Sequence, residues 1–393
     1  MPVIALVDGE HHPAAVRDVL DALDAERGLS AVVFCGGEEK LGPGSRDEQY
    51  GRPTREDPER ALRELAGDAD AVVDLADEPV VPAGAKLKIA SLALHLGLAF
   101  ESPGARLDPP RYERVGFDGP KLAVIATGKR TGKTAVAGHW AGLLRDRDPV
   151  VVCMGRGGPA APRLADGDTG LDDLLSIVAA GGHGASDYLE DAVLAGVRTV
   201  GCRRVGGGLA GQPADSNVAA GAALAASLGP GVMLFEGSGA CIPPVEVDRT
   251  VCILGVGDPE PFAGYRLLRA DLVLARGEGG PPGSLRFELR PEPAEPLPEG
   301  ARAALFTTGA TEVAGVDPVV ASDNLARRSA LAEDLRRAEA EDCDVFLTEL
   351  KGAAIDTVAT HARARGARVI FVRNRPIGIE ADLDRALMAL ATG

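Results

Sequence analysis

The 393-residue sequence predicts an α/β fold with mostly parallel sheets, and three observations lead to this prediction. Short runs rich in β-branched residues alternate with helical stretches, a pattern typical of parallel strands covered by helices on both faces. Glycine is abundant, at 50 residues, while aromatic residues make up only 4%, which suits tight strand–helix turns. Hydrophobic residues make up 45% and charged residues 25%, so the chain is expected to form packed cores.

Residues 1–118 are predicted to form a small N-terminal Rossmann-like domain. Its strands are expected at 3–8, 31–37 and 71–77, and its helices at 13–27 and from about 84 to 96. A polar, proline-containing connection at 101–120 marks the expected boundary.

A larger block, residues 119–290, is predicted to be the second domain, with strands at 121–127, 149–155, 199–205, 232–236, 250–256 and 271–276. The segment 290–300 is rich in proline and acidic residues and is expected to be an extended linker or a surface crossing. A C-terminal α/β extension, residues 300–393, follows. Its expected strands are 302–307, 345–349 and 368–373, and its helices are about 323–341, 355–365 and a final helix.

The charge balance excludes several partners. With 42 Lys and Arg against 58 Asp and Glu, the net charge is −16 at neutral pH, whereas non-specific binding to nucleic acid or anionic membranes requires a positive field. No apolar run approaches the ~20 residues that span a membrane, and no secretory signal is apparent. The 6 cysteines lack zinc-finger spacing, and several lie in apolar strand-like runs. We therefore expect a cytoplasmic protein without a structural zinc.

The strongest motif is the loop 127–134, TGKRTGKT, which follows an apolar strand and precedes a helix. It matches the GxxxxGK[ST] loop with its first glycine replaced by Thr127. In such loops backbone N–H groups surround phosphate oxygens, the lysine reaches the β- and γ-phosphates, and the hydroxyl ligates Mg²⁺. The sequence therefore predicts a P-loop NTPase core that binds ATP and Mg²⁺. The expected nucleotide contacts are Gly128, Lys129, Arg130, Thr131, Gly132, Lys133, Thr134 and Ala135.

Two roles in this loop are specific: Lys133 as the phosphate-binding and catalytic lysine, and Thr134 as a metal ligand. Lys129 and Arg130 add two cations to the same loop. They are either solvated or bind a second anion, and they join Lys133 as catalytic candidates. A glycine-rich turn that only caps the helix is the alternative interpretation.

An acidic partner for the metal is expected at the end of a neighbouring strand. Glu236 follows the apolar run 232–235 and precedes Gly-Ser-Gly, at the strand end where α/β sheets bind ligands. It is the candidate that ligates Mg²⁺ or orients water, and a turn acid near a helix start is its alternative. Asp187, where a glycine-rich loop enters a helix, is either an N-cap or a further Mg²⁺ ligand.

Three arginines at strand ends are candidate ligands for an anionic substrate. Arg156 follows the strand 149–155, and Arg203 and Arg204 precede a run of three glycines. The planar guanidinium suits bidentate phosphate binding. Consecutive residues of a strand face opposite sides, so only one of Arg203 and Arg204 is expected to reach the pocket. A solvated surface arginine is the alternative for each of them.

Histidines supply further substrate-binding candidates. His183 lies in a glycine-rich loop, where a solvated side chain is the competing interpretation. Glu10, His11 and His12 lie between the first strand and a helix, where they could contact substrate, hold a metal or exchange protons. A polar turn that leads into the helix is the alternative, and without a third ligand at recognisable spacing we do not predict zinc.

The segment 232–243 resembles the equivalent part of dethiobiotin synthetase and its P-loop relatives. The whole chain more closely resembles the cyclic 2,3-diphosphoglycerate synthetase family. The motifs that carry this resemblance are VDGEHHP (7–13), TGKRTGKT (127–134), MGRGGP (154–159), GCRRVGGGLAG (201–211), LFEGSG (234–239) and ADLVLARGE (270–278). The resemblance implies ATP-dependent closure of a phosphoanhydride between the two phosphates of 2,3-diphosphoglycerate, with release of ADP and phosphate.

Other interpretations stay open from the sequence. Among enzymes these are a phosphoglycerate-type kinase or a dethiobiotin-synthetase-like ligase that acts on another acid. From another class, the core could be a nucleotide-driven switch that binds proteins. We expect a homodimer, and a requirement for K⁺ is left open. The strand ends 348–352 and 373–376 either close over the active site or form a subunit contact.

Overall fold

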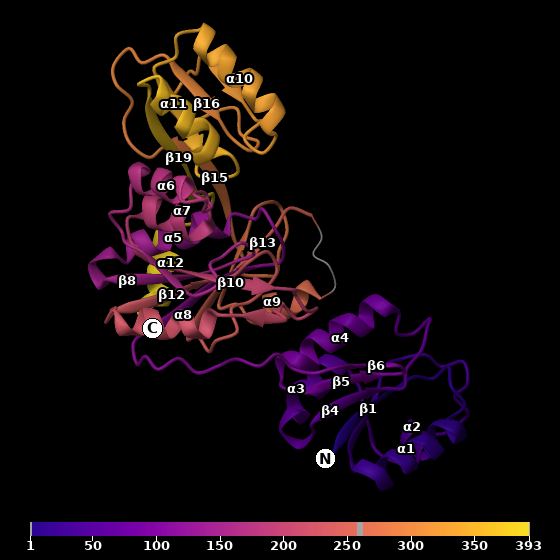
Figure 1. Cartoon of the computed structure of the whole chain (residues 1–393). Coiled ribbons are helices and arrows are strands. Elements are labelled where there is room, and N and C mark those ends of the chain that lie inside the picture. Colours follow the sequence, from indigo (N-terminus) through magenta and orange to yellow (C-terminus); the bar gives the residue numbers. More distant parts are fainter. Residues whose placement is uncertain (1, 258–261, 393) are drawn as a thin grey trace. The chain divides into compact units, whose positions relative to one another are not determined.

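The computed structural model describes residues 2–257 and 262–392. The chain divides into two compact units, coloured along the sequence in Figure 1. Unit 1 comprises the residues up to Arg111, together with Leu209–Gly211 and a short segment that ends at Arg269, and unit 2 comprises the rest. Both units combine mostly parallel strands with helices, which confirms the predicted α/β class.

Unit 1 is built on a six-stranded sheet with the order β3-β2-β1-β4-β5-β6, in which only β6 runs antiparallel to its neighbour. The central strand β1 is buried along its whole length. The elements are β1 (Val3–Val7), α1 (Pro13–Arg27), β2 (Leu29–Phe34), α2 (Arg46–Tyr50), β3 (Thr54–Arg55), α3 (Pro58–Leu65), the 3₁₀ turn η1 (Ala66–Asp68), β4 (Ala71–Asp74), α4 (Ala83–His95), β5 (Ala99–Ser102), β6 (Ala105–Leu107) and α9 (Ala263–Leu268).

The expected connection at 101–120 is partly wrong, because its start belongs to the sheet. Residues 99–102 and 105–107 form the antiparallel pair β5 and β6, with Phe100 opposite Leu107. Gly104, at φ +79°, supplies the left-handed residue of the tight turn between them. The polar composition of this segment is therefore typical of an edge hairpin as well as of a linker.

Unit 2 holds the phosphate-binding loop and the C-terminal extension. Its elements are β7 (Lys121–Ala126), α5 (Lys133–Leu143), η2 (Arg145–Arg147), β8 (Pro149–Gly155), β9 (Arg163–Ala165), α6 (Leu171–Ala179), α7 (Asp187–Ala195), β10 (Arg198–Val205), β11 (Asp215–Ser216), α8 (Val218–Ser227), β12 (Val232–Glu236), β13 (Arg249–Leu254), β14 (Leu272–Ala275), β15 (Leu285–Pro293), β16 (Ala303–Phe306), β17 (Val320–Ser322), α10 (Arg328–Ala340), β18 (Val345–Glu349), the π-helix η3 (Ala354–Ala359), α11 (Thr360–Ala364), β19 (Arg368–Gly378) and α12 (Leu383–Thr392).

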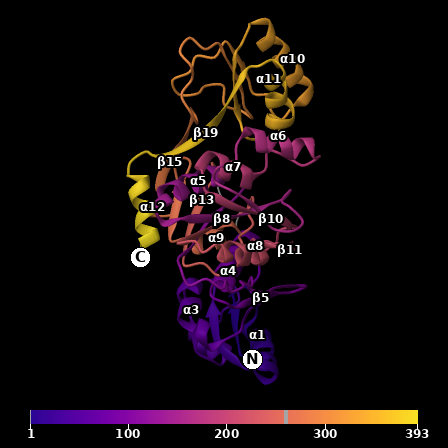
Figure 2. The same cartoon turned by 60° about the vertical axis from the view of Figure 1, so that its left-hand side comes forward.

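One continuous sheet runs through unit 2, in the order β11-β10-β8-β12-β7-β13-β14-β15-β19-β18-β16-β17. Strands β7, β8 and β12 are almost entirely buried, as parallel strands covered on both faces are. The long strands β15 and β19 pair antiparallel and link the core to the strands of the extension (Figure 2). Within the part of the chain that the structure describes, no helix is both long enough and apolar enough to cross a membrane.

The linker expected at 290–300 is wrong over its first residues, which belong to β15. Pro291 pairs with Asn374 and Pro293 with Val372 in the ladder with β19. The two prolines are two residues apart, so both ring nitrogens lie on the same side of the strand. Proline has no N–H to donate, and on an unpaired edge of a strand this costs no ladder hydrogen bond. The composition of 290–300 indicated an extended segment, but it did not indicate that this segment pairs with β19.

Two helices of the extension also differ from expectation. The helix expected from 323 begins only at Arg328, because the side chains of Ser322 and Asn324 both donate to Asp334 and hold the preceding loop against α10. The helix expected at 355–365 is a π-helix over Ala354–Ala359 that continues as α11. The P-loop core and the extension share one hydrophobic cluster that contains Trp140 and Phe346.

Gly132, the N-cap residue of α5, provides a test of how the phosphate-binding loop is built. Its φ is +101°, and an added Cβ would lie 2.8 Å from Leu289 Cδ1 of β15. We expect Gly132→Ala to lower the free energy of unfolding by about 1–3 kcal/mol. Gly142→Ala, in the same helix but facing open space, should be neutral or stabilise by ~0.5–1 kcal/mol. Urea unfolding of both variants measures this, and equal effects would contradict it.

Candidate functional site

The phosphate-binding loop leaves the end of β7 and enters α5 at Lys133. The Lys133 side chain is buried, and its Nζ donates to the Gly128 carbonyl oxygen at 3.2 Å, so the lysine folds back over the loop. Burial lowers the pKa of Lys133, while Glu236 and Asp187 act in the opposite direction. A desolvated ammonium in a loop of backbone amides is suited to bind phosphate.

Thr127 stands where such loops usually have their first glycine, and it binds the neighbouring strand. Its hydroxyl oxygen accepts a hydrogen bond from the Gly255 N–H at 3.3 Å, and its own N–H donates to the Ile253 carbonyl oxygen at 3.0 Å. Both partners lie at the end of β13, the strand beside β7. Thr127 therefore fastens the start of the loop to the neighbouring strand. The contact to its hydroxyl would be absent with glycine at this position.

Glu236 is the last residue of β12 and is buried, not a turn acid at a helix start. Its Oε1 accepts from the Thr134 hydroxyl at 2.7 Å, and its Oε2 accepts from the Cys153 thiol at 3.0 Å. Cys153 is its register neighbour on β8, so adjacent parallel strands bring the two together. Burial raises the pKa of Glu236, and the two hydrogen bonds and Lys133 oppose that rise.

Asp191 completes this group, although no sequence motif marks it. The ligand atoms of Cys153, Asp191 and Glu236 lie within 4.8 Å of one another, and all three residues are buried. Asp191 Oδ2 has no hydrogen-bond partner among the residues that the structure describes, and burial raises the Asp191 pKa well above its usual value. The oxygen donors of Thr134 and Glu236 fit a hard cation such as Mg²⁺, whereas the Cys153 thiol, whose pKa burial also raises, does not.

Asp187 is not the N-cap that one interpretation expected. Helix α7 begins at Asp187 itself, with Ser186 as its N-cap residue, and the Asp187 side chain is exposed. Its charge nevertheless acts on the pKa of Lys133 and of Glu236. His183 is exposed in the loop before α7. The metal role of Asp187 and the substrate role of His183 stay predictions.

Two guanidinium groups and the side-chain stem of Lys129 lie beside Gly239, just after β12. A Cβ added to Gly239 would lie 2.7 Å from an Arg156 guanidinium nitrogen, 3.5 Å from one of Arg204, and 3.5 Å from Lys129 Cγ. Arg204 is buried and donates to the carbonyl oxygens of Gly206 and Ser238. The loop after β12 thus lies against Arg156, which follows β8, Arg204 of β10 and the stem of Lys129 from the phosphate-binding loop.

Arg203 and Arg130, the other two arginines predicted to bind substrate or nucleotide, make different contacts. Arg203 points away from its neighbour Arg204 and lies 3.5 Å from Asp215 of β11, as strand alternation requires. Arg130 is exposed with φ +57°, and its carbonyl oxygen accepts from the Arg276 guanidinium. Their proposed contacts with substrate and nucleotide stay predictions.

Glu10, His11 and His12 belong to unit 1, at the carboxyl end of β1. Asp8, which is buried, accepts from the backbone N–H groups of Glu10 and His11 and from His11 Nδ1 at 2.8 Å. His12 is the N-cap residue of α1 and makes no side-chain capping bond. Their role in substrate binding stays a prediction.

A cavity of about 380 Å³ lies along the helix that follows the phosphate-binding loop. Its polar lining residues are Thr134 and His139 of α5, Arg145 of η2, Glu190 and Asp191 of α7, Arg373, Asn374 and Arg375 of β19, and Asp384 of α12. Glu190 also lies 3.6 Å from the ammonium of Lys351, which follows β18. Residues of the C-terminal extension therefore line the same cavity as Thr134. The two interpretations of 348–352 and 373–376, closure over the active site and a subunit contact, stay predictions.

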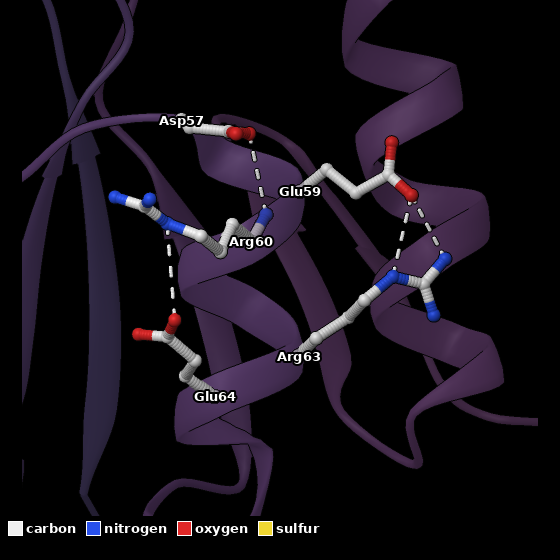
Figure 3. Close-up of a pocket in the computed structure, with 5 residues that line it drawn as sticks. All are labelled: Asp57, Glu59, Arg60, Arg63 and Glu64. Carbon is white, nitrogen blue, oxygen red and sulfur yellow. Dashed lines mark hydrogen bonds and ion pairs between the residues drawn. The ribbon is translucent and has the colours of Figure 1, made fainter.

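A second hollow, of about 420 Å³, lies on the surface of α3 in unit 1. Figure 3 shows that its charges are already paired: Arg63 donates to Glu59, and Arg60 lies 3.8 Å from Glu64. Exposed pairs one helical turn apart are ordinary surface features. This hollow therefore gives no functional site.

Three family descriptions match the chain. They are the cyclic 2,3-diphosphoglycerate synthetase N-terminal domain at residues 2–108, the P-loop domain at 121–277 and the C-terminal domain at 302–375. The chain belongs to the cyclic 2,3-diphosphoglycerate synthetase family. The resemblance drawn from the sequence motifs is confirmed, and a P-loop domain is part of it.

Relatives of the same name align along nearly the whole chain. The cyclic 2,3-diphosphoglycerate synthetase of Rubrobacter xylanophilus is 43% identical, covering 100% of this chain and 97% of its own. That of Thermococcus gammatolerans is 37% identical, covering 98% and 96%. That of Methanothermobacter thermautotrophicus is 33% identical, covering 99% and 95%. A solved structure, LpxK from Aquifex aeolicus in complex with ATP, aligns over 72% of this chain and 91% of its own, with a TM-score of 0.42 and 13% identity.

Glu190 should make the stability of this synthetase-family protein depend on pH. Burial raises its pKa to about 7, although Lys351 opposes the rise. Between about pH 4.5 and 7 the folded protein then holds a proton that the unfolded chain releases, so the free energy of unfolding falls as the pH rises.

The contribution of Glu190 to this fall is at most about 1.4 kcal/mol per pH unit. Glu190→Gln removes the titration while keeping the shape, so its unfolding free energy should fall less steeply over the same window. Urea unfolding of both proteins at pH 5, 6 and 7 measures the difference. Parallel pH profiles would show that this carboxyl group is not the source.

Proposed function

We propose that the protein closes 2,3-diphosphoglycerate into its cyclic phosphoanhydride at the expense of ATP, releasing ADP and phosphate. The proposal is supported by membership of this family along the whole chain. The structural observation that carries it is the convergence of Arg156, Arg204 and Lys129 beside Gly239, next to a phosphate-binding loop. One anion-binding group can hold the nucleotide while the other holds a polyanionic acid.

The chemistry explains why so many cations would be needed. The substrate has a carboxylate and two phosphates, and ring closure forces these anionic groups together. Cations fixed in advance lower the cost of that approach, and their effect is larger in a site from which water is excluded. Water must also be kept out because it would hydrolyse an activated phosphate. Arg204 is suited to this role since its side chain is already buried.

The reaction is proposed to run in two displacements. An oxygen of one substrate phosphate attacks the γ-phosphorus of ATP, the bond from that phosphorus to the β-phosphate oxygen breaks, and ADP leaves. An oxygen of the second substrate phosphate then attacks the phosphorus of the activated one. The bond from that phosphorus to the bridging oxygen breaks, and this oxygen leaves with the transferred phosphoryl group as inorganic phosphate as the ring closes.

The residues of the loop have separate tasks in this scheme. The backbone amides of 128–135 and Lys133 would hold the β- and γ-phosphates in line for attack. Thr134 and Glu236 would hold Mg²⁺, which offsets negative charge on the phosphates when it is bound. Because the hydroxyl of Thr134 donates to Glu236, its oxygen lone pairs remain available to a metal.

Lys133→Ala should lower the rate of phosphate release from ATP by about 100-fold or more, because the ammonium is lost where charge develops. The variant should stay folded, since among the described residues the Lys133 side chain makes a single hydrogen bond, to the Gly128 carbonyl oxygen. Lys88→Ala, at an exposed lysine of α4, is the matched control and should keep the wild-type rate. A folded Lys133→Ala protein with full turnover would refute the assignment.

Product analysis distinguishes the proposed reaction from its alternatives. ³¹P NMR of enzyme with ATP, Mg²⁺ and 2,3-diphosphoglycerate should show a cyclic pyrophosphate signal and free phosphate. A kinase would release no phosphate, and a nucleotide-driven switch would release it without any acid. With ¹⁸O in the substrate phosphates, label should appear in the released phosphate, and unlabelled phosphate would exclude this order of displacements.

We also propose that the enzyme is cytoplasmic and homodimeric. None of the 6 cysteines forms a disulfide, and all of them lie in the described part of the chain, which supports a reducing compartment. Light scattering of the purified protein tests the dimer, and titration with K⁺ tests the open requirement for that ion.

A further inference from the structure

Lys351 occupies an unusual position among the cations of the chain. It is the one lysine that follows Lys133 in the sequence, and it lies just after β18 in the C-terminal extension. Its Nζ is 3.6 Å from Glu190 Oε1, and 39% of its side chain is exposed. A charge-assisted hydrogen bond is typically 2.7–2.9 Å long. The ion pair is therefore longer than a charge-assisted hydrogen bond, and part of the Lys351 side chain is exposed.

The partner of this lysine lies in the site already described. Glu190 is buried and lines the same cavity as Thr134, and within the described part of the chain its Oε2 has no hydrogen-bond partner. Asp187, one helical turn earlier, acts on the pKa of both Lys133 and Lys351. The loop lysine and the extension lysine are thus within electrostatic reach of the same carboxylate.

The loop that carries Lys351 is held firmly in place. Glu349, two residues before it in the chain, accepts from the backbone N–H and hydroxyl of Thr308 at 2.8 and 2.7 Å, and from Asn374 at 3.2 Å. Gly352 has φ +55°, and an added Cβ would lie 2.8 Å from the Leu325 carbonyl oxygen. The turn is therefore fixed on both sides of the lysine, as a group that binds ligand at a set distance requires.

We propose that Lys351 is a second phosphate-binding lysine of the active site, held by Glu190 until ATP binds and then contacting the γ-phosphate. This inference rests on the proposed function for its catalytic role but not for its nucleotide contact. Lys351 would form no covalent bond and transfer no proton. It would balance charge on the γ-phosphoryl oxygens during transfer, beside the buried acids Glu190, Asp191 and Glu236 that otherwise repel them.

Binding measurements test the contact without any turnover. Isothermal calorimetry with Mg²⁺ compares ADP with the β,γ-imido analogue of ATP on wild type, Lys351→Met and the exposed control Lys88→Met. Lys351→Met should weaken the analogue by about 10-fold or more while changing the ADP affinity less than about 2-fold. The control should match wild type. A folded Lys351→Met protein with the wild-type ratio of the two affinities would overturn the proposal.

The variant Glu190→Gln distinguishes phosphate binding by Lys351 from a purely structural ion pair between Lys351 and Glu190. If Glu190 competes with ATP for the lysine, its removal should tighten analogue binding by about 3-fold or more. A purely structural pair predicts unchanged or weaker binding, which would contradict the proposal. If Lys351→Met does not fold, Lys351→Gln, which still donates a hydrogen bond toward Glu190, takes its place under the same criteria.

Turnover then tests the catalytic role. With 2,3-diphosphoglycerate present, Lys351→Met should lower kcat for phosphate release by about 100-fold while the KM for the acid changes little, and Lys351→Arg should recover part of the loss. An unchanged kcat in Lys351→Met would exclude the catalytic role. If wild type forms no cyclic product, the proposed function fails, and the ratio of analogue to ADP affinity still decides for or against Lys351.

Discussion

The hydrogen bonds to the buried carboxylate of Glu236 hold the site together. One joins the end of β12 to the first turn of α5 through Thr134, and the other joins it to β8 through Cys153. A buried carboxylate is costly unless polar partners surround it, so these contacts fix the loop relative to two strands.

Three buried acids lie close to the phosphate-binding loop. Glu190, Asp191 and Glu236 are all buried, and burial raises the pKa of each of them. A P-loop that receives a polyanion together with a divalent cation benefits from such acids, because they attract the metal and, when protonated, do not repel the phosphates. The cations lie around these acids: Lys133 within the loop, Arg156 and Arg204 by Gly239, and Lys351 from the extension.

Local patterns in the sequence predicted the parts of this site that lie within one strand–loop–helix unit. The phosphate-binding loop, Glu236 at a strand end, and the opposite directions of Arg203 and Arg204 all follow from short-range rules of period and position. Asp191 and Lys351 could not be found in this way. Asp191 lies in an ordinary helix, and Lys351 reaches Glu190 across 161 positions of sequence, a contact that only the completed sheet creates. The same reason hid the pairing of β15 with β19, since composition reports that a segment is extended but not which strand it meets.

That pairing decides how the extension can contribute to chemistry. A domain tethered by a flexible linker would deliver Lys351 over a wide range of distances and would lose conformational freedom each time it docked. Here β15 leaves the core sheet beside β14 and runs antiparallel along β19, which is itself paired with β18, the strand that ends two residues before Lys351. Two shared ladders and one common hydrophobic cluster therefore connect the lysine to the P-loop core. The extension loses its conformational freedom during folding and not when nucleotide binds. The Lys351 ammonium already lies beside Glu190 before nucleotide arrives.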